Sequence, residues 1–530
     1  MNYIIVQAGG KGTRLKYLTK NRPKALVPVD NLPMLFHLFR NYPDKRFVII
    51  ADYKKQVLRE YLASFADVKY QVVEALGQGT CGGVSQALKL IPDHEAFMLV
   101  WSDLILPEEF ELPEGYGGVV PDKPADRDYV GISATFPCRW KYEDGQFAEE
   151  RSTEYGVAGF FLFHEKSVLK EVPESGELVR YFAGKVESKE LSFSSVSLAG
   201  TREFGLLSEY QKLVNPKCRP FNKVTIKDDV FIKEPVDEQG RKLAKRECAW
   251  YEKAKELDIP VLPKIYSTSP LQMELVKGRN IYECDLSYQE KRKILVSLVD
   301  ALKQLHASDQ VPVDTFSMKE AYFNKTMDRL SSIRDLVPYA DQEYITVNGR
   351  KCRNVYFYKR LLEKRLDEIR CDHFSFIHGD CTFSNLMVKN GESGEPGEPV
   401  LIDPRGYFGF TELYGDELYD WSKLYYSIVG NYDRFNLKDF KLDIGGKSIY
   451  TEYTKDDDKG LKTGEVSLSI ASNHWEDMEE DFFKLTEVER DAIKLIHAVI
   501  WLSLTTYAWQ DYDSVCGAFY NGLYYLEEVL

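Results

Sequence analysis

Two prolines within five residues, Pro216 and Pro220, constrain the fold most, because such a pair interrupts any helix or strand. They divide the chain into two parts whose sequence patterns differ. The 530 residues suggest two to four domains at about 150 residues each. We therefore predict a first domain over residues 1–215 and a second over residues 221–530.

The first 210 residues alternate short β-branched runs with helical stretches. Predicted strands cover residues 3–7, 46–51, 68–74 and 96–101, and predicted helices cover residues 34–41, 54–64 and 83–91. Strands joined by crossover helices form a mostly parallel sheet. The first domain is therefore predicted to be α/β and Rossmann-like.

The second part begins with a different sequence pattern. Short apolar runs flank Asp228-Asp229 as a hairpin, and a charged helix over residues 241–257 and a strand over residues 272–276 follow. From residue 286 onward the pattern is mainly helical. We predict an α+β domain with a small lobe over about 221–278 and a helical large lobe over about 279–530. The polar segment 437–472 is predicted to be an insertion loop or a weak hairpin.

Composition excludes several classes of function. The net charge of −14 gives no general attraction to nucleic acid, so we expect no nucleic-acid partner. Nine cysteines without C-x-x-C spacing indicate neither a disulfide framework nor a zinc site. The longest apolar stretch, residues 493–509, contains Lys494 and His497 and predicts a core helix without membrane insertion. With no basic leader at the start of the chain, a cytoplasmic location is expected.

A glycine-rich turn follows the first predicted strand. Three glycines in four residues, Gly9, Gly10 and Gly12, allow backbone N–H groups to approach a polyphosphate, and Lys11 and Arg14 supply charge. The alternative is a tight strand–loop connection with a structural role alone. The run matches neither the dinucleotide fingerprint G-x-G-x-x-G nor the P-loop.

The run G-G-x-G-T-R-L, followed by P-K-A-L-V-P-V at residues 23–29, resembles the sugar-phosphate nucleotidyltransferase family, which includes phosphocholine cytidylyltransferases. The resemblance covers about residues 1–213. It implies that Gly10, Gly12, Thr13 and Arg14 hold the phosphates of an NTP. Lys24 would contact the α-phosphate or the incoming phosphate, where attack at phosphorus builds negative charge that cations stabilise.

The same resemblance implies two further groups of site residues. Asp103, at the end of an apolar strand, would bind Mg²⁺; the alternative is a helix N-cap or turn residue. Glu203 stands in Glu-Phe-Gly, where the family usually has D-x-G with a second metal carboxylate, so its role stays open. The loop that would face the nucleobase contains Gln78, Gly79 and Thr80.

The second domain contains the run I-H-G-D-C-T-F-S-N over residues 377–385. Asp380 and Asn385 have the spacing of the protein-kinase catalytic loop, where Asp takes the proton of the substrate hydroxyl and Asn holds a metal. Asp403 follows an apolar run 18 residues later, at the position of a second metal ligand. This H-G-D-x-x-x-x-N followed by I-D-P resembles the aminoglycoside phosphotransferase and choline kinase-like family, from about residue 221 onward.

That resemblance assigns nucleotide contacts upstream of the loop. Lys233 would meet the ATP phosphates, Glu247 would pair with Lys233, and the segment with Glu274 and Val276 would bind adenine through its backbone. Alternatively, Lys233 and Glu247 are solvated surface charges. His306 fits a family pattern, and a structural role is expected for it.

Together the two motif sets predict consecutive reactions. A kinase would phosphorylate a small alcohol with ATP, and a nucleotidyltransferase would join that phosphate to CTP, UTP or another NTP, both with Mg²⁺. The NDP-activated product would serve surface polysaccharide, such as a capsule, or lipid decoration. Two alternatives stay open: one domain is a regulatory nucleotide-binding module, or the whole chain is a non-catalytic nucleotide-binding sensor or scaffold.

The sequence leaves the alcohol open. Choline would need aromatic rings and carboxylates around its ammonium group, and one local cluster could supply them: Asp416, Glu417, Tyr419, Trp421 and Tyr425. Arg405, directly after Asp403-Pro404, favours a neutral or anionic sugar or polyol instead.

Overall fold

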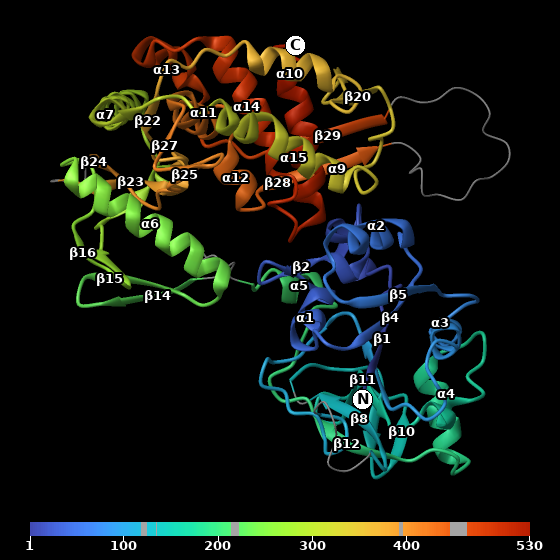
Figure 1. The fold of residues 1–530 in the computed structure, drawn as a ribbon. Coiled ribbons are helices and arrows are strands. Elements are labelled where there is room, and N and C mark those ends of the chain that lie inside the picture. Colours follow the sequence, from blue (N-terminus) through green and yellow to red (C-terminus); the bar gives the residue numbers. More distant parts are fainter. Residues whose placement is uncertain (118–124, 134, 214–221, 392–395, 446–463) are drawn as a thin grey trace. The chain divides into compact units, whose positions relative to one another are not determined.

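The computed structural model describes residues 1–530 except 118–124, 134, 214–221, 392–395 and 446–463 (Figure 1). The chain forms two compact units. The first contains residues 1–215 and 510–513, and the second contains residues 216–509 and 514–530. The predicted boundary at Pro216 and Pro220 lies outside the described residues, as does the middle of the polar segment 437–472.

A mixed sheet with a parallel centre forms the core of the first unit. β1 pairs in parallel with β4 and β6, β4 pairs in parallel with β5, and β11 runs antiparallel to β6. The bounds are β1 (Tyr3–Gln7), β4 (Arg46–Ala51), β5 (Lys69–Glu74), β6 (Phe97–Trp101) and β11 (Gly156–Phe163). The α/β fold with a mostly parallel sheet is therefore confirmed for this unit.

Four further strands of the same sheet and five α-helices belong to the described part of the first unit; β8 and β9 run antiparallel to β11, and β12 runs parallel to β8. β9 and β11 pair at one end, and β8 joins β11 to β12. The bounds are β8 (Asp128–Ser133), β9 (Lys141–Glu143), β10 (Gln146–Ala148), β12 (Phe193–Ser197), α1 (Met34–Asn41), α2 (Lys55–Phe65), α3 (Cys81–Leu88), α4 (Leu178–Glu187) and α5 (Leu207–Tyr210). Ile5 and Leu99 share one apolar cluster with Val84 of α3 and Phe182 of α4, so these helices cover that face of the sheet.

Strand pairing brings distant segments to one edge of this sheet. Because β1 and β6 are parallel neighbours, with Gln7 opposite Trp101, the loops that follow them begin side by side. Just beyond β6, the short strand β7 (Leu104–Ile105) pairs with β13 (Arg202–Glu203), and this register sets Glu203 opposite Leu104. The glycine loop, Asp103 and Glu203 are thereby gathered at the carboxyl edge of the parallel strands.

The second unit begins with an antiparallel sheet in the order β14-β15-β17-β16. The strands are β14 (Asn222–Lys227), β15 (Val230–Pro235), β16 (Ile265–Thr268) and β17 (Leu271–Glu274), and the helix α6 (Glu238–Glu256) follows β15 (Figure 1). Asp228 and Asp229 both have positive φ in the β14–β15 turn, a conformation that Asp tolerates. The predicted hairpin, helix and strand are all present here.

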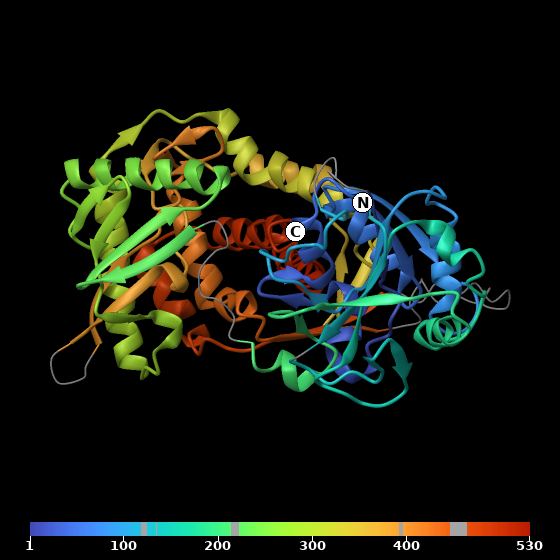
Figure 2. The same cartoon turned by 90° about the horizontal axis from the view of Figure 1, so that it is seen from below.

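Helices make up most of the remaining second unit (Figure 2). The larger ones are α7 (Tyr288–Ser308), α9 (Lys325–Ile333), α10 (Lys359–Asp367), α11 (Glu417–Ile428), α13 (Glu479–Thr486), α14 (Arg490–Leu504) and α15 (Tyr512–Leu526). The predicted core helix over residues 493–509 corresponds to α14. The described ends of the polar segment 437–472 form the antiparallel strands β28 (Phe440–Gly445) and β29 (Gly464–Ile470).

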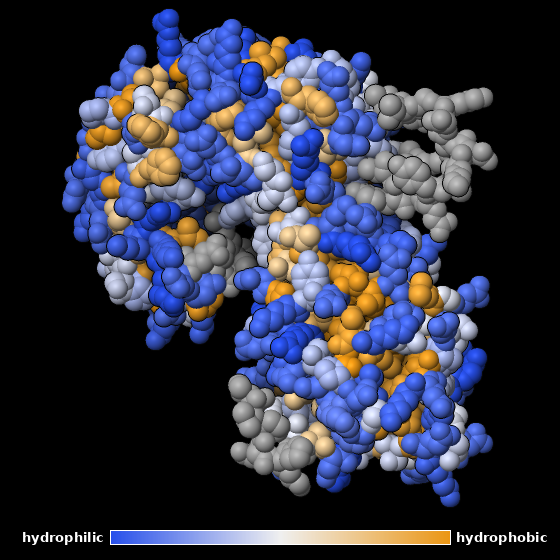
Figure 3. Space-filling view, turned by 45° about the vertical axis from the view of Figure 1, so that its right-hand side comes forward, coloured by the Kyte–Doolittle hydropathy of each residue, from blue (hydrophilic) through white to orange (hydrophobic). Residues whose placement is uncertain are grey.

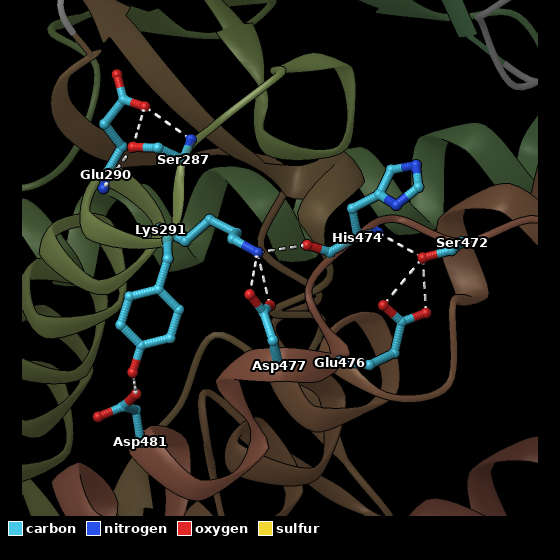
Figure 4. Close-up of polar contacts among 9 residues, drawn as sticks. Ser287, Glu290, Lys291, Ser472, His474, Glu476, Asp477 and Asp481 are labelled. Carbon is cyan, nitrogen blue, oxygen red and sulfur yellow. Dashed lines mark hydrogen bonds and ion pairs between the residues drawn. The ribbon is translucent and has the colours of Figure 1, made fainter.

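Helix α7 is fixed at its start by a polar cluster (Figure 4). Ser287 caps the helix, and Glu290 bonds back to the Ser287 backbone in a capping box. The Lys291 ammonium donates to the Asp477 carboxylate and, over 2.8 Å, to the carbonyl of His474. The last turn of the same helix carries His306, whose ring bonds Asp420 of α11.

The surface seen in Figure 3 is mainly hydrophilic, and hydrophobic residues gather over part of the first unit. Among the described residues, no helix combines the length and the apolar character that a membrane span needs. In the second unit, Trp250, Trp421 and Trp475 are buried in one apolar cluster.

Candidate active sites

The glycine loop of the first unit leaves room for a ligand. A Cβ atom added at Gly10 would meet no atom within 4 Å, so packing does not require glycine there. Gly12 has a φ of +61°, and a Cβ there would lie 3.1 Å from Cβ of Lys24. Gly9 is packed against Asp52, 2.8 Å from its Cβ. Glycine is thus required by packing or conformation at Gly9 and Gly12, while Gly10 faces open space with its exposed neighbours Lys11 and Thr13.

Beside this loop, a cation and two carboxylates meet. The Lys24 ammonium forms an ion pair with Asp103, and both side chains are nearly buried. Burial tends to raise the pKa of Asp103, but Lys24 holds it below its ordinary value. Burial and the adjacent Asp103 raise the pKa of Glu203 to about 7. Arg14 approaches the same corner, since its guanidinium would lie 3.1 Å from a Cβ added at Gly205.

The structure therefore places Arg14, Lys24, Asp103 and Glu203 together, although Glu203 is separated by 100 residues from Asp103. Two close carboxylates that are only partly neutralised by one lysine attract a further cation or proton. This cluster can hold and neutralise a phosphate chain whose negative charge grows during attack at phosphorus.

The loop of Gln78, Gly79 and Thr80 lies before helix α3. Its polar groups are largely used in the fold: the Thr80 hydroxyl accepts from Leu178 N–H over 2.8 Å, and the Gln78 carbonyl accepts from Gly176 N–H. A Cβ at Gly79 would lie 2.3 Å from the Gly176 carbonyl, so only glycine fits there. The exposed side chain of Gln78 is the group in this loop that can reach a ligand.

In the second unit, Lys233 of β15 links two carboxylates. Its ammonium lies 2.9 Å from Glu247 of α6 and 2.6 Å from Asp403. Burial and the nearby Asp403 raise the pKa of Glu247 to about 7, whereas the two carboxylates keep the pKa of Lys233 above its ordinary value against the effect of burial. Lys233 and Glu247 are therefore paired inside a cavity, and the alternative of solvated surface charges is wrong.

The catalytic loop follows β22 (Phe374–Phe376) and presents Asp380. The Asn385 side-chain amide donates to Asp380 Oδ2 over 3.0 Å, and Lys423 of α11 lies 3.0 Å from Asp380 Oδ1. Both oxygens of the predicted base are thus oriented. The sequence motifs did not reveal Lys423. It lies on α11, outside the catalytic-loop motif, and comes close to Asp380 only because this helix packs against the loop.

The loop backbone is held by another residue that the motifs did not reveal. Asp420, fully buried on α11, accepts from the N–H groups of His378 and Gly379 over 2.8 and 2.7 Å. The Asp420 carboxylate also bonds the His306 ring, whose Nε2 lies 3.0 Å from Asp420 Oδ2. His306 therefore acts on the loop through Asp420, which agrees with the structural role expected for it.

Asp380, Asp403 and Lys233 line one cavity of about 330 Å³ together with several tyrosines and further cations. Of the five residues proposed for a choline site, Tyr419 alone lines it. Asp416 is buried, caps α11 and accepts from the Tyr322 hydroxyl, and Tyr425 donates to Glu479. The prediction of a choline cluster is therefore wrong for Asp416, Glu417, Trp421 and Tyr425. Neighbouring residues along this segment point in different directions, and these four side chains do not line the cavity.

The predicted adenine segment ends the strand β17. The Glu274 N–H is already bonded to the Lys264 carbonyl over 2.9 Å, and the next residue, Leu275, donates to the Asp229 carbonyl. Val276 follows without lining the cavity around Asp380. The role of Glu274 and Val276 in holding a base stays a prediction.

Comparison with known families agrees with both sites. A family model described as nucleotidyl transferase matches residues 3–112, and one described as phosphotransferase enzyme family matches residues 232–403. The chain thus combines two classes of transferase. It carries an N-terminal nucleotidyl transferase domain and a C-terminal phosphotransferase domain of the kinase type, which confirms both predicted resemblances.

Two relatives of known name each share part of their sequence with this chain. The bifunctional protein GlmU of Methanocaldococcus jannaschii is 31% identical over an alignment of 137 residues, and the match covers 22% of this chain and 32% of that protein. The UTP–glucose-1-phosphate uridylyltransferase AglF of Haloferax volcanii is 36% identical over an alignment of 108 residues, and the match covers 19% of this chain and 43% of that protein. The chain spans less than half of the length of both relatives.

Among solved structures, an inositol-1-phosphate CTP transferase from T. maritima is similar, with 19% identity and a TM-score of 0.32. The match covers 39% of this chain and 91% of that one.

Proposed function

We propose that this chain is a bifunctional enzyme that phosphorylates a small alcohol with ATP and then joins the phosphate to an NTP. The observation that carries the proposal is that, in each unit, charged side chains from distant segments of the chain lie close together. Lys24, Asp103 and Glu203 meet beside an open glycine loop, and Asp380 is oriented by Asn385 in the cavity that Lys233 and Asp403 line.

In the kinase step, the hydroxyl oxygen of the alcohol attacks the γ-phosphorus of ATP, and the bond to the β-bridging oxygen breaks. ADP leaves, and the hydroxyl proton passes to Asp380, whose Oδ2 and Oδ1 accept hydrogen bonds from Asn385 and Lys423. Lys233, fixed by Glu247, neutralises ATP phosphate charge.

In the nucleotidyl step, a phosphate oxygen of the acceptor attacks the α-phosphorus of an NTP and pyrophosphate leaves. Lys24 and Arg14 face the charge that develops, and the backbone around Gly10 receives the phosphate chain. One of the similar proteins, AglF of Haloferax volcanii, is by its name a uridylyltransferase that uses UTP and glucose 1-phosphate. The product proposed for this chain is an NDP-sugar or a compound of the CDP-choline type, which would serve surface polysaccharide or lipid decoration.

In both units, side chains with oxygen atoms that can bind Mg²⁺ lie close together. Asp103 with the adjacent Glu203, and Asp403 with Asn385, offer oxygen ligands of the kind that Mg²⁺ takes together with substrate phosphates. When bound, the ion would neutralise phosphate charge. The raised pKa of Glu203 beside Asp103 supports this assignment, because a carboxylate pair of that kind lacks sufficient positive charge.

The experiment separates the two activities. The full chain is incubated with ATP and a panel of alcohols while ADP is measured, and with each NTP and sugar phosphates while pyrophosphate is measured. Both products are expected. Release of one product only would favour a single catalytic domain, and release of neither under any combination would favour the sensor or scaffold.

A further inference from the structure

Four cations gather at one end of the kinase cavity: Lys325, Arg329, Arg405 and Lys423. This group, here named the cationic end, comes from α9, α11 and the segment after Asp403. Two of the carboxylates that line the cavity, Glu247 and Asp403, bond Lys233 instead. Asp380 is the remaining carboxylate among the lining residues, and it contacts Lys423. The cationic end therefore carries more positive than negative charge.

The hydrogen-bond partners of the two arginines are neutral. Arg405 donates to the phenol oxygens of Tyr419 and Tyr407 over 2.8 and 2.6 Å. Arg329 donates to the carbonyl and the hydroxyl of Ser503 over 2.6 and 2.9 Å. Such partners fix the direction of a guanidinium group without cancelling its charge. Both arginines are thus held in place with their charge still available to a ligand.

Lys325 is the least compensated member. It lies partly buried in the cavity wall, and within the described part of the chain its ammonium has no hydrogen-bond acceptor. Burial, followed by the charges of Arg405, Arg329 and Lys423, lowers its pKa to about 6, and Glu320 opposes this weakly. A lysine so placed is costly to the fold, and functional sites are where such costs concentrate.

We infer that the alcohol substrate is itself an anion, whose phosphate or carboxylate group is bound by the cationic end while its hydroxyl meets Asp380. The inference rests on the proposed kinase function. Arginine and lysine are the side chains that recognise phosphate and carboxylate, and arginine does so with paired N–H groups. A quaternary ammonium or a polycation would instead be repelled by the net positive charge of the cationic end, to which Arg329, Arg405 and Lys423 contribute at neutral pH.

The first test compares neutral alcohols with anionic alcohols of the same carbon number. Glycerol is paired with glycerol 3-phosphate and glycerate, glucose is paired with glucose 6-phosphate and gluconate, and choline is added. With Mg·ATP, kcat/KM for ADP release is expected to be roughly 10–100-fold higher for an anionic member than for its neutral partner, as one or two charge-assisted hydrogen bonds would give. The phosphate and carboxylate arms identify which anion is preferred.

The second test measures binding rather than turnover. Inorganic phosphate is titrated calorimetrically into the full chain saturated with Mg²⁺ and a non-hydrolysable ATP analogue, which fills the nucleotide-phosphate site. Arg329→Met should weaken phosphate binding at least tenfold. Arg334→Met is the matched control, since Arg334 ends the same helix but lies over Tyr356, outside the cavity lining. It should bind phosphate like the parent protein.

The outcomes separate the two claims. A faster anionic alcohol together with binding that depends on Arg329 supports the inference. If choline or a neutral alcohol is the better substrate, the kinase stands and the inference is wrong. If no alcohol is phosphorylated but phosphate binding still requires Arg329, the anion site stands and the proposed kinase function fails. Phosphate binding that is absent, or that Arg329→Met leaves unchanged, overturns the anion site.

Discussion

The strongest prediction about folding stability concerns Lys325, because its side chain is held where a positive charge is unfavourable. Burial lowers its pKa most, and the nearby cations Arg405, Arg329 and Lys423 lower it further, to about 6. In the unfolded chain a lysine keeps a pKa near 10.4. Between these two values the unfolded state binds about one proton more than the folded state at this position.

The sign follows from proton linkage. Where the unfolded state binds the extra proton, stability rises with pH, here by roughly 1.4 kcal/mol per pH unit between about pH 6 and 10. Lys325→Met removes this dependence together with the cost of the misplaced charge. At pH 7 the variant is therefore expected to be more stable than the parent, by about 1–4 kcal/mol, as found when buried charges are replaced by apolar residues of similar size.

Calorimetry at half-unit steps from pH 6.5 to 8.5 measures this effect. The unfolding transition of the parent kinase unit should move up by about 2–4 °C per pH unit relative to that of Lys325→Met. Lys319→Met is the control, because Lys319 is paired with Asp367 and Glu363 and its pKa is raised. Parallel pH dependences of the parent and Lys325→Met would refute the reasoning.

Three further variants test the assigned site residues. Lys24→Ala should lower pyrophosphate release by about 10²–10³-fold with ADP formation unchanged, because it removes a cation preorganised for the α-phosphate; an unchanged rate would remove Lys24 from the site. Asp380→Asn should abolish ATP-dependent phosphorylation while pyrophosphate release from a supplied sugar phosphate continues, and near-normal phosphorylation would refute its role as base. Asp403→Ala should raise the Mg·ATP concentration needed for half-maximal rate at least tenfold, and an unchanged Mg²⁺ dependence would contradict its role as a metal ligand.

Local sequence predicted those parts of the molecule that local forces decide. The strand–helix alternation of the first unit, the Asp228-Asp229 turn and helix α6 all follow from apolar periodicity and turn chemistry. The glycine loop and the catalytic loop were likewise readable, since each places its functional groups within about ten residues. In such segments backbone geometry alone brings the groups together.

Contacts between distant segments could not be read in this way. Glu203 reaches Asp103 because β13 pairs with β7, and both are two-residue strands that leave no periodic signal. The cations Lys325, Arg329 and Lys423 meet through helix packing, and on the sequence each is an ordinary charged residue on a helix. The choline cluster failed for the same reason, because neighbours along α11 point to different faces of the helix.

Asp420 shows what such a distant contact can contribute to catalysis. Its two carboxylate oxygens accept from consecutive N–H groups, those of His378 and Gly379, immediately before the base Asp380. Gly379 has a φ of +80°, and a Cβ atom added there would meet Arg405. The loop therefore makes a turn at this position that favours glycine. The carboxylate fixes that turn, and His306 fixes the carboxylate.

Asp420→Asn should therefore misplace Asp380 without removing it. An asparagine offers one acceptor oxygen and turns an NH₂ group toward the second N–H, so one backbone donor loses its partner at a cost of about 1–3 kcal/mol. We expect kcat for ADP formation to fall roughly 10²-fold while the KM for ATP changes little, because a displaced base affects the transition state more than nucleotide binding. Asp416→Asn is the matched control: Asp416 is equally buried at the start of the same helix but bonds Tyr322 and Leu418 rather than the loop. A comparable loss of thermal stability in both variants with loss of kcat in Asp420→Asn alone would establish the positioning role, whereas equal kcat values in the two variants would reduce Asp420 to a stabilising residue.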